Sequence, residues 1–573
     1  MSPVTLVTGL FVFHESYNFF VISHQALFWL SGRLNQSAAV KEIDKDSITM
    51  NVLLVYPKMP DTFYAMKHFI HVIGKKAAYP PLGLLTIAPL LPVDWSRKLI
   101  DLNLRDLDAA DLNWADYVLL SAMNVQEESV SDIVALCNAA KVPVIAGGPL
   151  FTHEHERFPS IDYFVLNEAE ITLPLFLEDL KNGCPQRIYQ TEKFANVEES
   201  PLPAFELVDM DQYIYSIVQY SRGCPYMCDF CDVTALFGRR PRTKTSAQII
   251  RELEAIDEQD SVQLVLFADD NLIGNKRILK KDLLPALIEW RKKHKPGFFF
   301  ATQLTINLAD DEELMDLMIE AGFRHVFIGI ETPSAESLKE SLKTQNLRRD
   351  QLGNIKLLHE KGFIIAGGFI VGFDTDTEAI FQQQIDFIQE SGIPLPIVNI
   401  LKAPPGTDLY ARIKREGRLS RPFAFGEGET NIVPAMDEKM LFDGFLKVIT
   451  NIYTPEKSYE RLINFFQTYK IPKTTVKVPE KIRLKDLKMI FRVVFLLGIR
   501  DAHRGTFWKL VYWAFKNQRK NVDKAVLYGI MTYQMHQTYL HIKKTVLDQN
   551  KELYQPGYSS PQTLQSQVAL QNA

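Results

Sequence analysis

Cysteine is scarce in this chain, with 5 residues among 573. So few cysteines in so long a chain exclude a disulfide framework and favour a reducing compartment, so we expect a cytoplasmic protein. The net charge of -5 gives no sign of general nucleic-acid affinity. An apolar fraction of 46% and a charged fraction of 23% are ordinary for a globular protein, and the length implies several domains.

The N-terminal residues 1–49 lack an uninterrupted apolar run. Four polar side chains, His14, Glu15, His24 and Gln25, interrupt their aromatic and apolar stretch, whereas a membrane helix needs about 20 apolar residues. A basic start and a small-residue cleavage site are also missing, so the sequence does not predict a signal peptide. We therefore expect a flexible leader or extension, with folded structure beginning after it.

Three of the five cysteines lie close together, at Cys224, Cys228 and Cys231. Their C-x3-C-x2-C spacing, in a loop with Gly223 and Pro225, can hold three irons of a four-iron cluster, which usually has four cysteine ligands. No fourth cysteine follows nearby, so one iron would stay open to an outside ligand. Two alternatives remain, namely a zinc site, which normally requires four ligands, and three buried, unreactive thiols.

Residues 50–205 alternate between strand-like and helix-like patterns, which predicts a doubly wound parallel sheet. The predicted strands are 52–55, 97–101, 117–121, 142–146 and 163–166, and the predicted helices include 83–91 and 128–140. Such sheets bind ligands beyond the carboxyl ends of their strands, where Ser121, Gly147, Gly148 and Glu168 lie. The two glycines indicate either an ordinary turn or a close approach of the backbone to a large ligand.

Residues 206–420 contain six further strand-like runs with helices between them, which predicts a partial barrel of six β/α units. The predicted strands are 216–220, 263–267, 298–303, 325–333, 364–373 and 396–401, and the predicted helices are 245–256, 282–293, 310–321, 351–361 and 377–390. Chemistry in barrels of this kind takes place at the carboxyl ends of the strands. The candidate cofactor-binding residues at these ends are Asp269, Asp270, Asn271, Gln303, Glu331, Gly367 and Gly368. Each of these residues alone could be a polar strand end that faces water. Their occurrence on successive strands favours a shared cofactor-binding site.

The cysteine loop, with Phe230 directly before its last cysteine, resembles the cluster loop of the radical S-adenosylmethionine (SAM) enzymes. Further sequence segments resemble those of the cobalamin-binding group of that family, and within it the hopanoid C-2 methylase group. They are Asn51 to Pro57, Ala146 to Pro149, Asn167 to Glu170, Cys231 to Lys244, Asp269 to Asn275, Gly329 to Pro333 and Gly367 to Thr377. The resemblance is close over about residues 50 to 430 and loose beyond them.

The resemblance implies a 4Fe-4S cluster held by the three cysteines, with SAM chelating the open iron. It places Asp269, Asp270 and Asn271 near the SAM amino group, Gln303 near its ribose or carboxylate, Glu331 near its ribose, and Gly367 and Gly368 against its adenine. Within residues 239–244 the basic side chains are interpreted as solvated, or as holding the SAM carboxylate or an anionic substrate.

The resemblance also implies cobalamin at the strand ends of residues 50–205. The motif Asp-x-His-x-x-Gly, which supplies a histidine below the cobalt in other cobalamin proteins, is missing from the chain, so we expect no such ligand. The alternative is a vestigial domain that only packs on the core.

The implied reaction transfers a methyl group to an unactivated carbon, with a hopanoid-type lipid as the suggested substrate. The alternatives are a radical SAM enzyme of another reaction type and a non-enzymatic iron–sulfur or cobalamin protein. We expect a small-molecule or lipid substrate, an electron donor such as a flavodoxin or ferredoxin, and no nucleic acid as partners. No catalytic side chain is singled out.

Residues 421–550 are mostly helical by pattern, and the tail 551–573, rich in Gln, Ser and Pro, is expected to be disordered. The segment 481–520 contains eleven Lys or Arg and two Asp, interleaved with apolar and aromatic residues. It is interpreted either as an amphipathic stretch on an anionic membrane surface, which would make the protein peripheral to the membrane, or as helices that pack on the barrel with solvated lysines.

Overall fold

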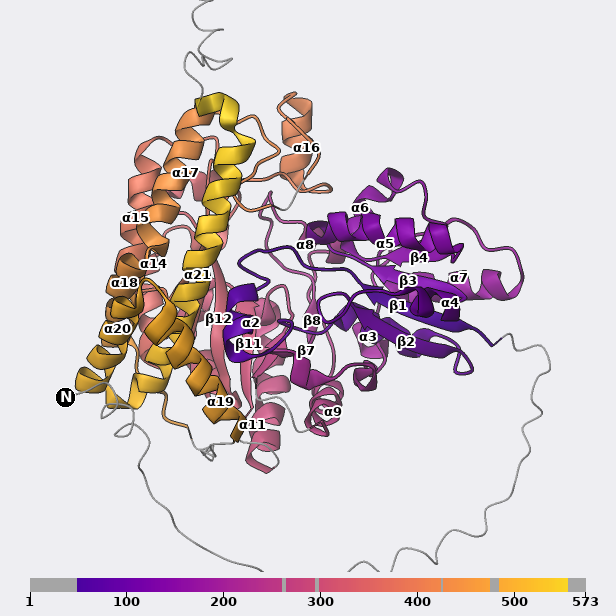
Figure 1. The fold of residues 1–573 in the computed structure, drawn as a ribbon, viewed down its shortest axis with the longest axis horizontal. Helices are drawn as coiled ribbons and strands as arrows, with labels where there is room; N and C mark the ends of the chain where they lie inside the picture. The colour runs from indigo at the N-terminus through magenta and orange to yellow at the C-terminus, as the bar shows by residue number, and fades with distance from the viewer. Residues whose placement is uncertain (1–48, 260–263, 294–297, 424–425, 475–483, 555–573) are drawn as a thin grey trace, which may run out of the picture. The chain divides into compact units, whose positions relative to one another are not determined.

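The computed structural model of the protein describes residues 49–259, 264–293, 298–423, 426–474 and 484–554 (Figure 1). The predictions for the leader and for most of the tail lie outside these residues. Residues Lys551–Tyr554, expected in the disordered tail, form a short 3-10 helix, because Leu553 is buried in the core. The boundaries expected at residues 205 and 420 stay predictions.

The first sheet of the described chain has six strands in the order β2-β1-β3-β4-β5-β6, with parallel neighbours. Its strands are β1 (Asn51–Tyr56), β2 (Ser96–Asp101), β3 (Tyr117–Ser121), β4 (Val144–Gly147), β5 (Tyr163–Val165) and β6 (Ile188–Tyr189). Its helices are α3 (Leu82–Ile87), α4 (Ala109–Trp114), α5 (Glu127–Ala140), α6 (Pro149–Glu154) and α7 (Ala169–Lys181). Residues 52–55 are fully buried, since helices cover both faces. The predicted doubly wound sheet is confirmed, and only the two-residue β6 was missed.

The second sheet also has six strands within the described residues, in the order β14-β13-β12-β11-β10-β7, again with parallel neighbours. Its strands are β7 (Ser216–Val218), β10 (Leu264–Phe267), β11 (Phe299–Leu304), β12 (Phe323–Glu331), β13 (Ile364–Val371) and β14 (Leu395–Ile400). The helices between and after them are α9 (Ser246–Asp257), α10 (Lys276–Lys281), α11 (Leu283–Lys293), α12 (Glu312–Ala321), α13 (Ala335–Glu340), α14 (Gln351–Lys361), α15 (Ala379–Ser391) and α16 (Asp408–Arg415). The predicted six β/α units are confirmed.

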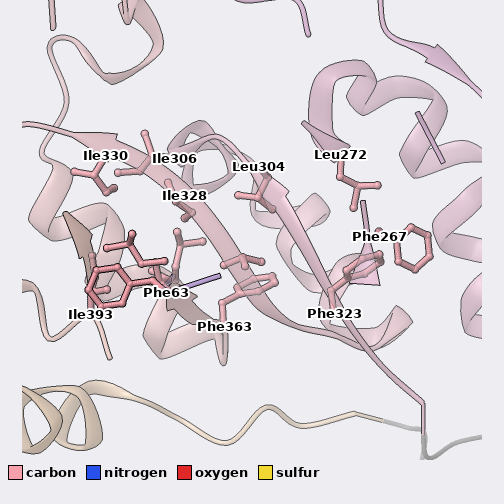
Figure 2. Packing of buried hydrophobic residues seen from close by; sticks show 14 of the residues in the cluster. Phe63, Phe267, Leu272, Leu304, Ile306, Phe323, Ile328, Ile330, Phe363 and Ile393 are labelled. Carbon is pink, nitrogen blue, oxygen red and sulfur yellow. The ribbon is translucent and has the colours of Figure 1, made fainter. Parts of the chain in front are cut away.

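Alternate residues of the second sheet bury apolar side chains beneath its helices. Figure 2 shows this cluster, with Phe267, Leu304, Phe323 and Ile328 among the labelled side chains. Phe63, which comes from a segment that follows β1, belongs to the same cluster. The core of the second sheet therefore includes a side chain from the N-terminal part of the chain.

The connection 57–81 between β1 and α3 reaches both edges of the second sheet. Near edge strand β7, Ala77 forms an isolated parallel bridge with Tyr213. Near edge strand β14, the Phe63 ring lies 5.0 Å from the ring of Tyr453, whose hydroxyl accepts a hydrogen bond from Val398 N at 3.2 Å. The connection therefore spans the distance between the two edge strands of the sheet.

The C-terminal region is helical, as predicted. Its helices are α17 (Glu438–Tyr453), α18 (Pro455–Thr468), α19 (Leu484–Val493), the π-helix η10 (Val494–Arg500), α20 (Arg504–Asn517) and α21 (Val522–Gln549). Helix α2 (Lys67–Ile73), from the connection described above, packs against α21 (Figure 1). Among the described helices, none combines the length and the apolar character that crossing a membrane requires.

Candidate functional site

The cysteine loop is closed at its base by a short antiparallel ribbon. The ribbon pairs β8 (Ser221–Arg222) with β9 (Arg242–Thr243), and the Lys244 amide donates to the Tyr220 carbonyl at 2.8 Å. Between these strands the loop leads into α8 (Val233–Phe237). Because β8 follows β7 directly, the ribbon holds the loop beyond the carboxyl end of the first barrel strand, where such folds bind ligands.

The three cysteines are half-buried, free thiols with amide donors nearby. Asn271 Nδ2 donates to Cys224 Sγ at 3.9 Å, and Gln345 Nε2 donates to Cys228 Sγ at 3.6 Å. Burial raises the pKa of Cys224 and of Cys231, so these thiols keep their protons until a metal replaces them. The described residues hold no group of three His, Cys, Asp or Glu side chains around one metal ion. A four-iron cluster does not need such a group, since each thiolate binds a different iron, and the donors present fit that cluster.

Gly223 sets the backbone at the start of the cysteine loop, with φ +92°. A Cβ there would lie 2.9 Å from the Gly238 carbonyl oxygen and 3.0 Å from those of Arg240 and Phe237. We expect Gly223→Ala to displace Cys224, because strain of about 1–3 kcal/mol adds to a clash with backbone that cannot yield. Anaerobic reconstitution with iron and sulfide should leave the variant with less than about half the iron of the wild type.

Gly183→Ala is the matched control for this prediction. Gly183 has φ +70°, and nothing lies within 4 Å of the Cβ that alanine would add. This variant carries the backbone strain without the clash, so it should take up iron as the wild type does. Equal iron contents in the two variants would mean that the loop does not depend on the tight packing at Gly223.

Asp269 anchors the backbone that leads into the cysteine loop. Its buried carboxylate accepts hydrogen bonds from the Tyr220 amide at 3.2 Å, and from the amide and hydroxyl of Ser221 at 2.5 Å each. Burial raises the pKa of Asp269 to about 7. Both oxygens accept hydrogen bonds within the turn between β7 and β8. The expected contact of this side chain with a SAM amino group stays a prediction.

Asp270 and Asn271 point their polar groups toward the loop itself. Asp270 accepts a hydrogen bond from the Gly223 amide at 2.9 Å, and burial raises the pKa of its carboxyl to about 6. The buried Asn271 uses Nδ2 for Cys224, while its Oδ1 finds no hydrogen-bonding partner in the part of the chain that the structure describes. An unsatisfied acceptor beside the thiols is therefore available to an ammonium group.

Gln303 and Gly368 share the inner face of the second sheet, whereas Gly367 does not. Gln303 is exposed although its neighbours along β11 are buried. A Cβ on Gly368 would lie 2.9 Å from the ring of Phe327, which pairs with Gln303 across the sheet. A Cβ on Gly367 would instead meet Ile393 at 3.0 Å on the buried face. Successive residues of a strand face opposite sides, so Gly368 lies on the inner face and Gly367 on the buried face. The expected adenine contacts of the two glycines stay predictions.

Glu331 ends β12 in a buried ion pair with Lys343. Its Oε1 accepts a hydrogen bond from Lys343 Nζ at 2.6 Å, and its backbone has the unusual φ of +67°. Burial acts to lower the pKa of Lys343, but the charges of Glu331 and Cys228 outweigh it and raise that pKa. Lys343 Nζ lies 6.0 Å from the ring of Phe230 in the cysteine loop. One oxygen of the expected ribose ligand is thus committed to a lysine that no sequence pattern singled out.

Glu168 binds two arginines of the ribbon. It accepts hydrogen bonds from Arg222 and Arg242 at 2.9 Å, and from the Ala195 amide at 2.7 Å. Glu170 accepts a second bond from Arg222 at 2.7 Å. Burial acts to raise the pKa of Glu170, but Arg222 holds that pKa below its usual value.

We call Glu168, Glu170, Arg222 and Arg242 the arginine clasp. It ties the start of α7 to both strands of the ribbon, so the first sheet positions the cysteine loop. Both oxygens of the buried Glu168 are bound within the protein, and its expected contact with a cofactor stays a prediction. Arg242, from the basic stretch 239–244, is paired with Glu168 rather than solvated.

The glycines at the end of β4 are explained by close contacts with neighbouring residues. Gly148 has φ +94°, and a Cβ there would lie 2.9 Å from Ser121 Oγ and 3.0 Å from the Ala122 carbonyl oxygen. A Cβ on Gly147 would lie 2.7 Å from the Val165 carbonyl oxygen. The ordinary turn, one of the two interpretations above, therefore accounts for both glycines, while Ser121 stays half-buried at the same strand ends.

The carboxyl-terminal edges of the two sheets meet at His153. This residue lies in α6, and a Cβ on Gly406, in the loop after β14, would lie 2.6 Å from its ring. Burial lowers the pKa of His153, and the carboxylate of Asp232, next to Cys231, only partly offsets that effect. Its Nε2 is buried and lacks a hydrogen-bonding partner among the described residues. The two edges that bind ligands in such folds therefore adjoin each other beside the cysteine loop.

Comparison with known sequences agrees with this architecture. The model of the radical SAM superfamily matches residues 218–388, and that of a domain of unknown function, DUF4070, matches residues 407–549. An uncharacterised methyltransferase of Synechocystis is 36% identical over 466 residues, which are 80% of this chain and 86% of the relative. The hopanoid C-2 methylase of Rhodopseudomonas palustris is 33% identical over 467 residues, which are 80% of this chain and 88% of that enzyme.

Two solved structures share the fold at low identity. The cobalamin-dependent SAM radical enzyme OxsB, solved with aqua-cobalamin and SAM, is 15% identical with a TM-score of 0.54, and the match covers 87% of this chain and 81% of OxsB. The methyltransferase TsrM of Kitasatospora setae, solved with cobalamin and a 4Fe-4S cluster, is 14% identical with a TM-score of 0.52. That match covers 85% of this chain and 100% of TsrM.

Proposed function

This chain belongs to the cobalamin-binding radical SAM family and is a methyltransferase of that class, and we propose that it methylates an unactivated carbon of a hopanoid-type lipid. Support for this substrate comes from the similarity to the hopanoid C-2 methylase, with which the chain shares 33% identity over 467 residues. The observation that carries the proposal is the meeting of two ligand-binding sheet edges beside the cysteine loop. Methyl transfer by two cofactors requires such a junction.

Specific residues would hold the cofactors on the two sides of this junction. Cys224, Cys228 and Cys231 would bind the cluster irons. Asn271 and Gln303 present polar groups to SAM, and cobalamin would lie at the strand ends of the first sheet, near Ser121 and His153. When bound, these cofactors supply hydrogen-atom abstraction and methyl transfer.

Glu427, which is bound by the connection 57–81, supplies a group that can orient the substrate. Burial raises the pKa of Glu427 to about 7, so its carboxyl holds a proton in part of the molecules at neutral pH. Its Oε1 accepts a hydrogen bond from the Phe63 amide at 2.7 Å, which leaves the proton to Oε2. Oε2 has no partner in the described ranges.

Tyr64 follows Phe63 in the connection 57–81. Burial raises the pKa of Tyr64, and the charges of Glu427 and Glu331 raise it further. Yet 37% of Tyr64 remains accessible. We propose that the substrate contacts Tyr64 at this accessible surface. Glu427 and Tyr64 would bind a hydroxyl group there, while the connection excludes water from the reacting carbon.

Lipid extracts of a deletion strain and its parent test the substrate. Methylated hopanoids should be absent from the deletion strain, restored by the wild-type gene and by Cys184→Ala, and not restored by Cys228→Ala. An unchanged methylated-hopanoid profile in the deletion strain would remove the lipid substrate. Experiments on the purified protein distinguish a wrong substrate from a wrong enzyme class. If only the substrate is wrong, a bound corrinoid spectrum and 5'-deoxyadenosine formation would still identify the enzyme class.

A further inference from the structure

The continuous helix formed by α19 and η10 carries apolar side chains on its outward side. Phe491, Phe495 and Ile499 are 75%, 46% and 60% exposed. They are spaced four residues apart, so they form one stripe along the helix. The rings of Phe491 and Phe495 lie 6.5 Å apart and are nearly parallel, with 9° between their planes. Large apolar groups in such an arrangement mark a surface that is covered during function.

The inward side of the same helix is already packed. Val493 and Leu497 are buried, and the carbonyl oxygen of Gly498 accepts a hydrogen bond from Trp508 Nε1 of α20 at 2.9 Å. Packing on the rest of the protein therefore explains this side of the helix. This packing does not explain the stripe, which lies on the opposite side of the helix. The exposed apolar residues therefore need another explanation.

Positive charge surrounds the stripe. The segment 481–520 carries eleven Lys or Arg and two Asp, whereas the whole chain has a net charge of -5. Lys488, Arg500 and Arg504 are exposed along the helix and at its turn into α20. A second copy of this chain that packed its own stripe against this one would bring the same positive charge and be repelled. An anionic surface with an apolar interior would attract the basic side chains and bury the apolar side chains of the stripe.

We propose that this face, which we call the basic apolar face, docks the protein onto an anionic lipid bilayer. Phe491, Phe495 and Ile499 enter the boundary between headgroups and acyl chains, while the surrounding lysines and arginines stay at the headgroups. The helix lies in the plane of the membrane surface. This proposal rests on exposure and charge, so it stands whether or not the substrate is a hopanoid.

Flotation of the full-length protein with vesicles tests the docking. The wild type should float with vesicles of phosphatidylcholine and phosphatidylglycerol, and it should bind vesicles of phosphatidylcholine alone at least about tenfold more weakly. Raising the salt concentration should weaken the binding, because salt screens the attraction to the headgroups. Absence of flotation with anionic vesicles would overturn the proposal.

Two sets of variants locate the surface. The triple variant F491S/F495S/I499S should lose about tenfold or more of the partition into anionic vesicles, because three large apolar groups no longer enter the bilayer. The control L136S/L175S removes exposed apolar side chains from α5 and α7 and should bind as the wild type does. Unchanged SAM cleavage by the reconstituted triple variant shows that it is folded. Equal flotation of the two variants would contradict the proposal.

A photo-crosslinker identifies what covers the stripe. Benzoylphenylalanine at position 495 keeps the aromatic ring and should crosslink to lipid in anionic vesicles. Crosslinks to residues 1–48 of the same chain, or to a second copy, in the presence of vesicles would assign the stripe to a protein contact. Either of these results would overturn docking on a bilayer.

Discussion

Replacing Cys228 with alanine is expected to abolish SAM cleavage and to leave the fold intact. Three thiols are the minimum that holds a four-iron cluster with one open iron, so the loss of one of them destroys the site. Production of 5'-deoxyadenosine should fall more than about a hundredfold, with a matching loss of bound iron. Cys228 is half-buried in a loop, so its removal should change the free energy of unfolding of the apo-protein by no more than about 0.5 kcal/mol.

The remaining cysteines provide two controls for this experiment. Cys184 is exposed, so Cys184→Ala should keep the iron, the cleavage and the stability of the wild type. Cys137 is buried in the core of the first sheet, where burial raises the pKa of its thiol to about 11. Cys137→Ala should therefore lower the stability by about 1 kcal/mol while the iron is retained. If Cys228→Ala still binds iron and cleaves SAM, the iron is held elsewhere.

Replacing Glu168 with alanine should destabilise the protein more than replacing any other carboxylate residue of the candidate site. Removal of one member of a buried ion network leaves the other charges uncompensated, at a cost of about 3–5 kcal/mol. We expect a cost at the lower end of that range, because both arginines retain other hydrogen-bonding partners. Arg222 still binds Glu170, and Arg242 still donates to the carbonyl oxygens of Ala195 and Phe237. Urea unfolding of the apo-protein, followed by tryptophan fluorescence, measures this loss.

The clasp also predicts a local effect on the cysteine loop. Hydrogen exchange at the Lys244 amide, which closes the ribbon, should become at least about tenfold faster in Glu168→Ala. The matched control is Glu360→Ala, which removes a solvent-exposed pair with Lys470 at 3.1 Å and should cost less than about 1 kcal/mol. Equal changes in the two variants would mean that the clasp does not hold the ribbon.

Much of the fold was accessible from local patterns. The strand 117–121 and the helix 351–361 were predicted at the residues where the structure has them, as β3 and α14. Continuous apolar runs and helical periodicity depend only on residues that are close in the sequence. Both patterns therefore identify a strand or a helix without knowledge of its tertiary contacts. The two-residue strands β6, β8 and β9 were missed, since they exist only through pairing with distant segments.

The candidate site divides in the same way. Spacing along the chain was enough to single out three thiols as cluster ligands and to place polar residues at the ends of parallel strands, because both depend on covalent order and strand direction. The spacing did not reveal which polar groups are already engaged. Asp269, Glu168 and Glu331 are committed to Ser221, two arginines and Lys343, through contacts that only folding creates. Whether a carboxylate binds a ligand or the protein itself is decided by its spatial neighbours, which its place in the chain does not specify.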